Sequence, residues 1–104
     1  MIFVSSCRPM GDDPEYYANQ LAAKASWELV ARAIVYFNDF QPALASPKTR
    51  FLPSQPYPFI RDMVDFCADQ NGEWCALINS DIIVTPVMKK VLEKINGKKG
   101  YAAF

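Results

Sequence analysis

The segment PFIRDMVDFCADQNGEWCALINSDIIVTPVMKKVLEKI, from Pro58 to Ile95, decides the fold. Its pattern predicts a helix over 58–70, a buried strand over 74–78 and a second helix from Pro86 to Ile95. The strand is an unbroken apolar run, which is typical of a strand covered on both faces. A polar triplet, Asn79-Ser80-Asp81, follows it directly. We therefore place a candidate site at the carboxyl end of this strand, the edge at which ligands bind in open α/β sheets.

The rest of the chain repeats the alternation of strand and helix. Apolar runs predict strands at Ile2–Val4 and Ala33–Phe37, a short edge strand over 49–52 and a strand-like tetrapeptide over 101–104. Asp13-Pro14 is typical of a helix start. We therefore predict a single α/β domain over 1–104 with three α/β/α layers and a small, mostly parallel, Rossmann-like sheet.

The first predicted helix runs from Pro14 to about Arg32. Its alanine-rich sequence predicts close packing on a sheet, as expected for a crossover helix. We expect its apolar side to carry the residues at a spacing of four and their neighbours: Tyr17, Leu21, Ala25, Leu29, Ala18, Ala22 and Trp27.

Composition excludes several classes of function. Eleven basic and eleven acidic side chains balance, so no overall charge favours nucleic acid or an anionic membrane. There is no histidine, and three widely spaced cysteines without a CxxC pair argue against a zinc site or a disulfide framework. No apolar run is long enough to span a membrane, and the first residues lack the pattern of a signal peptide. We expect a cytoplasmic protein.

Three polar loop tips are expected to share one edge of the sheet. They are Ser6 to Arg8 after the first strand, Asn38-Asp39 after the second, and Asn79 to Asp81 after the strand over 74–78. If this last strand pairs with the first on the side opposite the second, the strand order reverses there and the three tips converge on one crevice.

The central segment resembles the nucleotide-sugar-binding half of GT-A fold glycosyltransferases, especially the large family of inverting enzymes. The resemblance is carried by Arg61-Asp62, Gly72-Glu73-Trp74, the apolar strand, Asn79-Ser80-Asp81 and Pro86, in the order and similar spacing typical of the family. It extends to the first strand and to Asn38-Asp39, which is similar to the acidic turn that meets the base. It covers most of this chain but only the donor-binding half of a complete enzyme.

This resemblance implies a nucleotide diphosphate sugar as partner and a divalent metal, Mn²⁺ or Mg²⁺, as cofactor, held by Asp81. The implied ligand-binding residues are Ser6, Arg8, Asn38, Asp39, Arg61, Asn79 and Ser80. Hard cations prefer such oxygen ligands, and a guanidinium suits a diphosphate. Each residue also has an ordinary alternative: Asp81 and Asn38-Asp39 suit plain turns, and Arg61 can pair with Asp65 one helical turn away.

The sequence departs from the family in two ways. Asn79 replaces the leading acid of the family's Asp-x-Asp motif, so Asp81 is the only carboxylate of the triplet. The acceptor-binding half, which carries the general base, does not follow, so we name no catalytic residue and expect a domain that is truncated relative to a full glycosyltransferase. The alternative is a truncated or repurposed, non-catalytic domain that acts through protein contacts, including a homodimer through an exposed strand edge.

Overall fold

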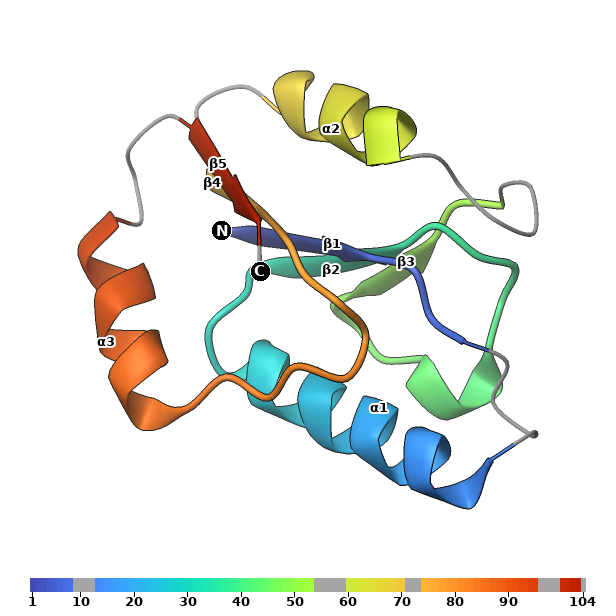
Figure 1. Ribbon diagram of the computed structural model, residues 1–104. Helices are drawn as coiled ribbons and strands as arrows, with labels where there is room; N and C mark the ends of the chain where they lie inside the picture. The colour runs from blue at the N-terminus through green and yellow to red at the C-terminus, as the bar shows by residue number, and fades with distance from the viewer. Residues whose placement is uncertain (9–12, 54–59, 71–73, 96–99, 104) are drawn as a thin grey trace.

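A computed structural model describes residues 1–8, 13–53, 60–70, 74–95 and 100–103. Strands and helices alternate along the chain, as the apolar patterns predict (Figure 1). The elements are β1 (Ile2–Ser5), α1 (Pro14–Glu28), β2 (Ala33–Tyr36), the 3-10 turn η1 (Pro42–Leu44), β3 (Thr49–Phe51), α2 (Ile60–Ala68), β4 (Trp74–Leu77), α3 (Pro86–Ile95) and β5 (Gly100–Ala103).

The strands form one parallel sheet with the order β3-β2-β1-β4-β5. β1 is central: its Phe3 lies opposite Ile34 of β2 and opposite Ala76 of β4. The predicted reversal of strand order beside β1 is therefore confirmed, and so is the α/β fold class.

Helices cover both faces of the sheet, because successive side chains of each strand point to opposite sides. Ile2 and Val4 of β1 belong to the apolar cluster that packs against α2 through Cys67. Phe3 belongs to the second cluster, which reaches Trp27 of α1 and Leu92 of α3. In Figure 1, α2 accordingly lies on one side of the sheet, and α1 and α3 lie on the other.

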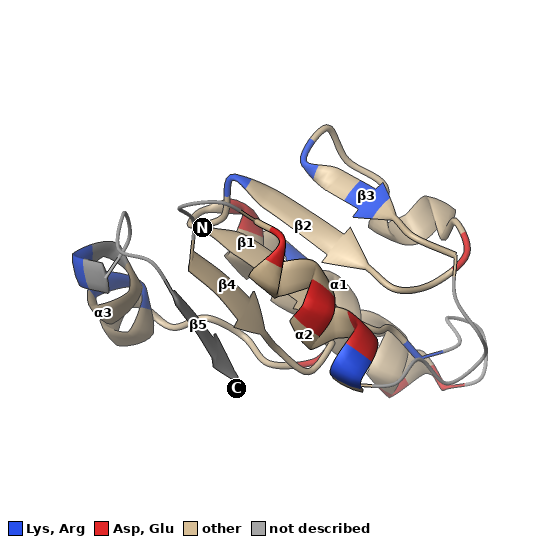
Figure 2. Ribbon diagram, turned by 90° about the horizontal axis from the view of Figure 1, so that it is seen from above, with Lys and Arg blue, Asp and Glu red and all other residues tan. Residues whose placement is uncertain are grey.

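The central strands carry no charged side chain. β1, β2 and β4 contain no Lys, Arg, Asp or Glu, whereas β3 carries Arg50 (Figure 2). The charged residues of α2, among them Arg61, Asp62 and Asp65, are exposed. Among the described residues, the charged side chains therefore lie outside the three central strands.

The prediction for α1 was wrong in its end and in its buried face. The helix ends at Glu28, four residues before Arg32. Its fully buried side chains are Gln20, Ala23 and Trp27. Tyr17 is 38% exposed and Leu29 is 73% exposed, and the side chains of Ala18, Ala22 and Ala25 are exposed as well. Of the predicted apolar side, Trp27 is buried and Leu21 packs against the core, whereas the other residues are exposed, because a buried glutamine occupies the side that faces the sheet.

The other helices match more closely. α3 spans Pro86–Ile95 as predicted, and Thr85 caps it by accepting the backbone N–H of Met88 at 3.3 Å. α2 is shorter at its carboxyl end than predicted, ending at Ala68 instead of residue 70. The predicted first two helical residues, 58 and 59, lie outside the described residues, as does residue 104 of the predicted last strand.

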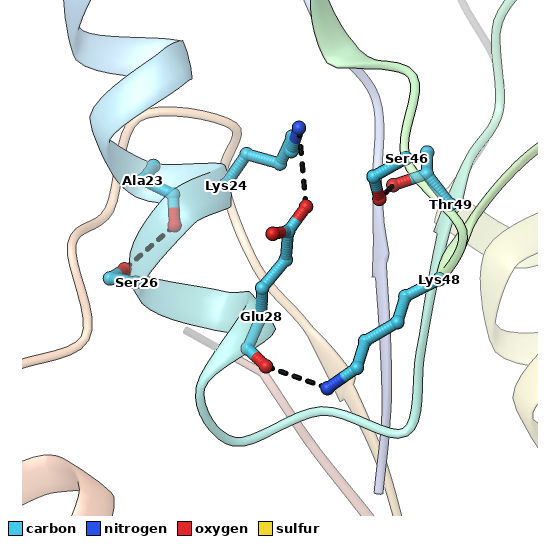
Figure 3. A network of polar contacts seen from close by, with 7 residues as sticks. All are labelled: Ala23, Lys24, Ser26, Glu28, Ser46, Lys48 and Thr49. Atoms are coloured by element: carbon cyan, nitrogen blue, oxygen red, sulfur yellow. Dashed lines mark hydrogen bonds and ion pairs between the residues drawn. The ribbon is translucent and has the colours of Figure 1, made fainter.

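The end of α1 is joined to β3 by a polar network (Figure 3). Lys48 donates to the carbonyl oxygens of Glu28 at 2.7 Å and Ala31 at 3.0 Å, so a cation neutralises the negative end of the helix dipole. Lys24 forms an ion pair with the Glu28 carboxylate at 3.2 Å. Burial raises the pKa of Glu28, but the Ser46 hydroxyl and the charges of Lys24 and Lys48 outweigh burial, and the net pKa is lowered.

We expect Glu28→Gln to lower the free energy of unfolding at neutral pH. Because the pKa of Glu28 is lowered in the folded protein, its carboxylate stabilises the fold above the unfolded pKa of about 4.3. That contribution is lost as the pH falls through the lower folded value. Urea unfolding of the variant and the unaltered chain should therefore differ at about pH 7 and converge towards about pH 3.

Lys24→Met provides the matched background. It removes one of the charges that lower the pKa of Glu28, so the pH-dependent effect of Glu28→Gln should be smaller in this background. A difference between variant and unaltered chain that stays constant from neutral to acidic pH would contradict this account.

Candidate functional site

The carboxyl ends of β1, β2 and β4 are fastened to one another at one edge of the sheet. The Ser5 hydroxyl donates to the Ile78 carbonyl oxygen at 2.6 Å. The Ile78 N–H donates to Val4 O at 3.0 Å, and the Phe37 N–H donates to Ser5 O at 2.9 Å. Ser5 is 1% exposed, so its hydroxyl makes this contact in the protein interior, where a lost partner is costly.

The loop after β1 is held by two side-chain amides, each of which contacts both polar groups of one residue. Asn38 Oδ1 accepts the Cys7 N–H at 2.8 Å, and Asn38 Nδ2 donates to Cys7 O at 3.2 Å. Gln20 Oε1 accepts the Arg8 N–H at 2.8 Å, and Gln20 Nε2 donates to Arg8 O at 3.4 Å. These two amides fix consecutive residues to the turn after β2 and to α1, which gives the loop a defined path.

A cavity of about 360 Å³ opens between these strand ends and the start of α2. Two polar side chains line it, Ser6 after β1 and Asn79 after β4. The remaining described lining is apolar and comprises Val4, Ile60, Met63, Leu77 and Ile78. A largely apolar hollow with a few polar groups is the usual form of a small-molecule site, and this one lies beside the pair of strands where the order reverses.

The Asn79-Ser80-Asp81 triplet forms a turn that closes with a bond from the Ile82 N–H to Asn79 O at 3.2 Å. Ser80 is 8% exposed, whereas Asn79 and Asp81 are exposed. The chain then crosses to the α1 side of the sheet. The three side chains of the triplet therefore lie in different environments: Asn79 lines the cavity, Ser80 is buried and Asp81 reaches solvent.

Two hydrogen bonds from α1 hold the segment after the triplet. The Trp27 Nε1–H donates to Ile82 O at 2.8 Å, and the Val84 N–H donates to Ser26 Oγ at 2.9 Å. Residues 82–85 have no regular secondary structure. α1 therefore positions the loop that carries Asp81, although the two are more than fifty residues apart in the sequence.

The remaining predicted site residues lie outside the described cavity lining. The Arg8 guanidinium carbon lies 4.5 Å from the centre of the Tyr16 ring, in a cation–π contact on α1. Arg61 is exposed on the first turn of α2, directly after the cavity residue Ile60. Asp39 is exposed after β2. The structure thus brings Ser6 and Asn79 together and joins Asn38 to them through Cys7.

The donor set for a metal is limited. Among the described residues, no three His, Cys, Asp or Glu side chains gather closely enough to hold an ion. Asp81 offers one exposed carboxylate, two residues after the exposed Asn79 amide. Oxygen donors of this kind fit Mg²⁺ or Mn²⁺ when a ligand's phosphate oxygens and water complete the shell.

Cys7 and Cys67 supply no activated nucleophile, because burial raises the pKa of both thiols. Burial raises the pKa of the Cys7 thiol, although a hydrogen bond with the backbone of Cys7 partly offsets the rise. Burial also raises the pKa of Cys67 to about 12, and the neighbouring Cys75 adds to the rise. A thiol is nucleophilic only as its thiolate, so burial disfavours the nucleophilic form of Cys7 and Cys67 in the folded protein.

Sequence reasoning missed two features of the site. Gln20 was missed because its amide binds the backbone of Arg8, which lies on another segment. The spacing of residues along a helix does not reveal such a contact. The apolar cavity residues Met63 and Leu77 read as ordinary core positions. The one available signal for Gln20 was its spacing of three and seven residues from Ala23 and Trp27, which places a polar residue on the same side of the helix as two apolar ones.

We expect Asn38→Ala to lower the free energy of unfolding by about 1–2 kcal/mol, because it removes both side-chain contacts to Cys7. Hydrogen exchange at the Cys7 amide should accelerate as well. Urea unfolding provides the first measurement and exchange the second. The exposed neighbour is the control: Asp39→Ala should change stability by less than about 0.5 kcal/mol, and equal losses in the two variants would contradict the role of Asn38.

Comparisons with known proteins give no relative for this chain: no family model matches it, and neither a curated protein nor a solved structure does. None of the helices in the described ranges combines the length and the apolar character needed to cross a membrane.

Proposed function

We propose that this chain binds a nucleotide diphosphate sugar and corresponds to the donor-binding half of a GT-A-like glycosyltransferase. The observation that carries the proposal is the cavity that Ser6 and Asn79 line between the carboxyl ends of β1 and β4. Ligands of open α/β sheets bind where the strand order reverses. The apolar walls suit a planar nucleobase, and the two polar side chains suit its orientation.

The proposed roles follow the positions of the residues. Asp81 would hold Mn²⁺ or Mg²⁺ with the oxygens of the diphosphate, and Asn79 and Ser80 would support that site. When bound, the cation would neutralise the negative charge that develops on the leaving diphosphate. Arg8 and Arg61 are exposed guanidinium groups available to the same phosphates.

The turn after β2 would contact the nucleoside. The Asn38 amide already binds the Cys7 backbone through both of its polar atoms, so its role is to position the loop that carries Ser6. The exposed Asp39 carboxylate would accept hydrogen bonds from the base or the ribose. In this proposal Asn38 therefore positions the loop after β1, and Asp39 contacts the nucleoside.

Calorimetric titration with a UDP-sugar and Mn²⁺ tests the proposal. We expect heat of binding at millimolar ligand, and we expect Asp81→Ala to remove its Mn²⁺-dependent part. Asp65→Ala, which removes an exposed carboxylate from α2, is the matched control and should bind like the unaltered chain. No heat at millimolar ligand, or the same heat after Asp81→Ala, would defeat the site assignment.

The second candidate is a repurposed domain that acts through protein contacts, and the two edge strands favour it. β3 and β5 each pair with one neighbour in the sheet, and an open strand edge can accept a strand from another chain. Light scattering separates the candidates. A dimer without affinity for nucleotide supports the second candidate, whereas a monomer that binds the UDP-sugar supports the first.

We also propose a cytoplasmic location. All three cysteines are buried thiols, and such thiols persist in a reducing compartment.

Neutral net charge gives no general attraction to nucleic acid.

A further inference from the structure

Two of the three thiols lie together directly behind the candidate cavity. Cys67 is on the last turn of α2 and Cys75 is on β4, and both belong to the apolar cluster between α2 and the sheet. The Cys75 thiol lies 3.9 Å from the Cys67 carbonyl oxygen, to which it donates. The two side chains also interact directly, since Cys75 is among the causes that raise the pKa of Cys67.

The same two elements form walls of the cavity. Met63 precedes Cys67 by four residues and therefore lies on the same side of α2, one turn away. Leu77 follows Cys75 by two residues and therefore points to the same face of β4. Since Met63 and Leu77 both line the cavity, the two thiols and two of the cavity walls belong to the same pair of elements.

We propose that Cys67 and Cys75 form an oxidation-sensitive dithiol, and that a disulfide between them fixes α2 onto β4 behind the cavity. The oxidant is a low-molecular-weight disulfide. One protein thiolate attacks it, breaks its S–S bond and releases one small thiol; the second protein thiolate then displaces the other half. The protein loses two electrons, the small disulfide gains them, and the two protein protons leave on the two released thiols.

Opening of the last turn of α2 controls this reaction. Burial raises the pKa of Cys67 to about 12, so the closed protein holds almost no thiolate at this position. Helix ends open locally at a low free-energy cost. Oxidation is therefore slow in the closed protein and accelerates at urea concentrations below the unfolding transition.

Disulfide mapping tests the proposal. The native full chain is incubated with oxidised glutathione, quenched with acid, labelled with a maleimide and cut after Glu73 by a glutamyl endopeptidase under denaturing conditions. We expect the peptides that hold Cys67 and Cys75 to stay joined, with the mass of two hydrogen atoms missing, while Cys7 takes the label. A link that includes Cys7, separate peptides that carry glutathione, or full labelling of Cys67 and Cys75 would overturn the proposal.

Two variants sharpen the result. Cys7→Ala should retain the link, whereas Cys67→Ala should lose it and leave Cys75 open to the label or to glutathione. A link that survives Cys67→Ala would contradict the assignment. Because the mapping of the unaltered chain decides the question by itself, poor folding of either variant does not affect it.

The effect on the cavity rests on the proposed function. We expect the oxidised chain to bind UDP roughly fivefold or more weakly than the reduced chain, a typical strength of coupling between two sites. Equal affinity would refute the coupling and leave the dithiol in place. No UDP binding by the reduced chain would refute the proposed function, while the disulfide map would still decide on the dithiol.

Discussion

The pairing of β1 with β4 is the contact on which the rest of the structure depends. β1 is already paired with β2 on one side, so the addition of β4 on the other side makes β1 the centre of the sheet. The first three strands are added in one direction across the sheet, and after β3 the next strand, β4, is added on the other side of β1. That reversal places the loops after β1 and β4 next to each other, and the buried bond from Ser5 to Ile78 holds them together. The cavity lies between these two strand ends and the start of α2.

The site edge is organised mainly by contacts between side chains and backbone. The amides of Asn38 and Gln20 hold the loop after β1, and the Trp27 indole and the Ser26 hydroxyl hold the loop after β4. Such contacts do not require a particular side chain on the loop itself. Loop residues such as Ser6 and Asp81 are therefore free to serve a ligand, while the surrounding helices and strands provide the shape.

The sequence predicted the fold well because its signals are local. Continuous apolar runs identified β1, β2 and β4, and the Thr85-Pro86 start located α3 within its observed bounds. α1 was harder to predict. Its alanines are compatible with several buried sides, and the choice of side depends on Gln20 and Trp27, whose partners lie on other elements. Which side of a helix becomes buried depends on contacts with other elements of the folded domain. The spacing of apolar residues in one sequence does not give those contacts.

For the candidate site, the sequence identified the polar loops but not how they divide between the faces of the sheet. Ser6 and Asn79 share the cavity, whereas Arg8 turns to Tyr16 on α1 and Asp81 reaches solvent. Asn79 to Asp81 form a turn, in which successive side chains take different directions. Neighbours in a polar triplet therefore enter different environments, and only the three-dimensional path of the loop determines which residue enters the cavity.

The central position of β1 also shapes how the domain is made during translation. β1 is synthesised before β2 and β4, and it receives its second neighbour only when residues 74–77 have left the ribosome. Until then, one edge of an apolar strand stays open, and the closing step joins segments far apart in the chain. Long-range pairing of this kind slows folding and leaves the nascent chain vulnerable to association with other strands. The architecture that creates the cavity thus leaves an apolar strand edge open until late in synthesis.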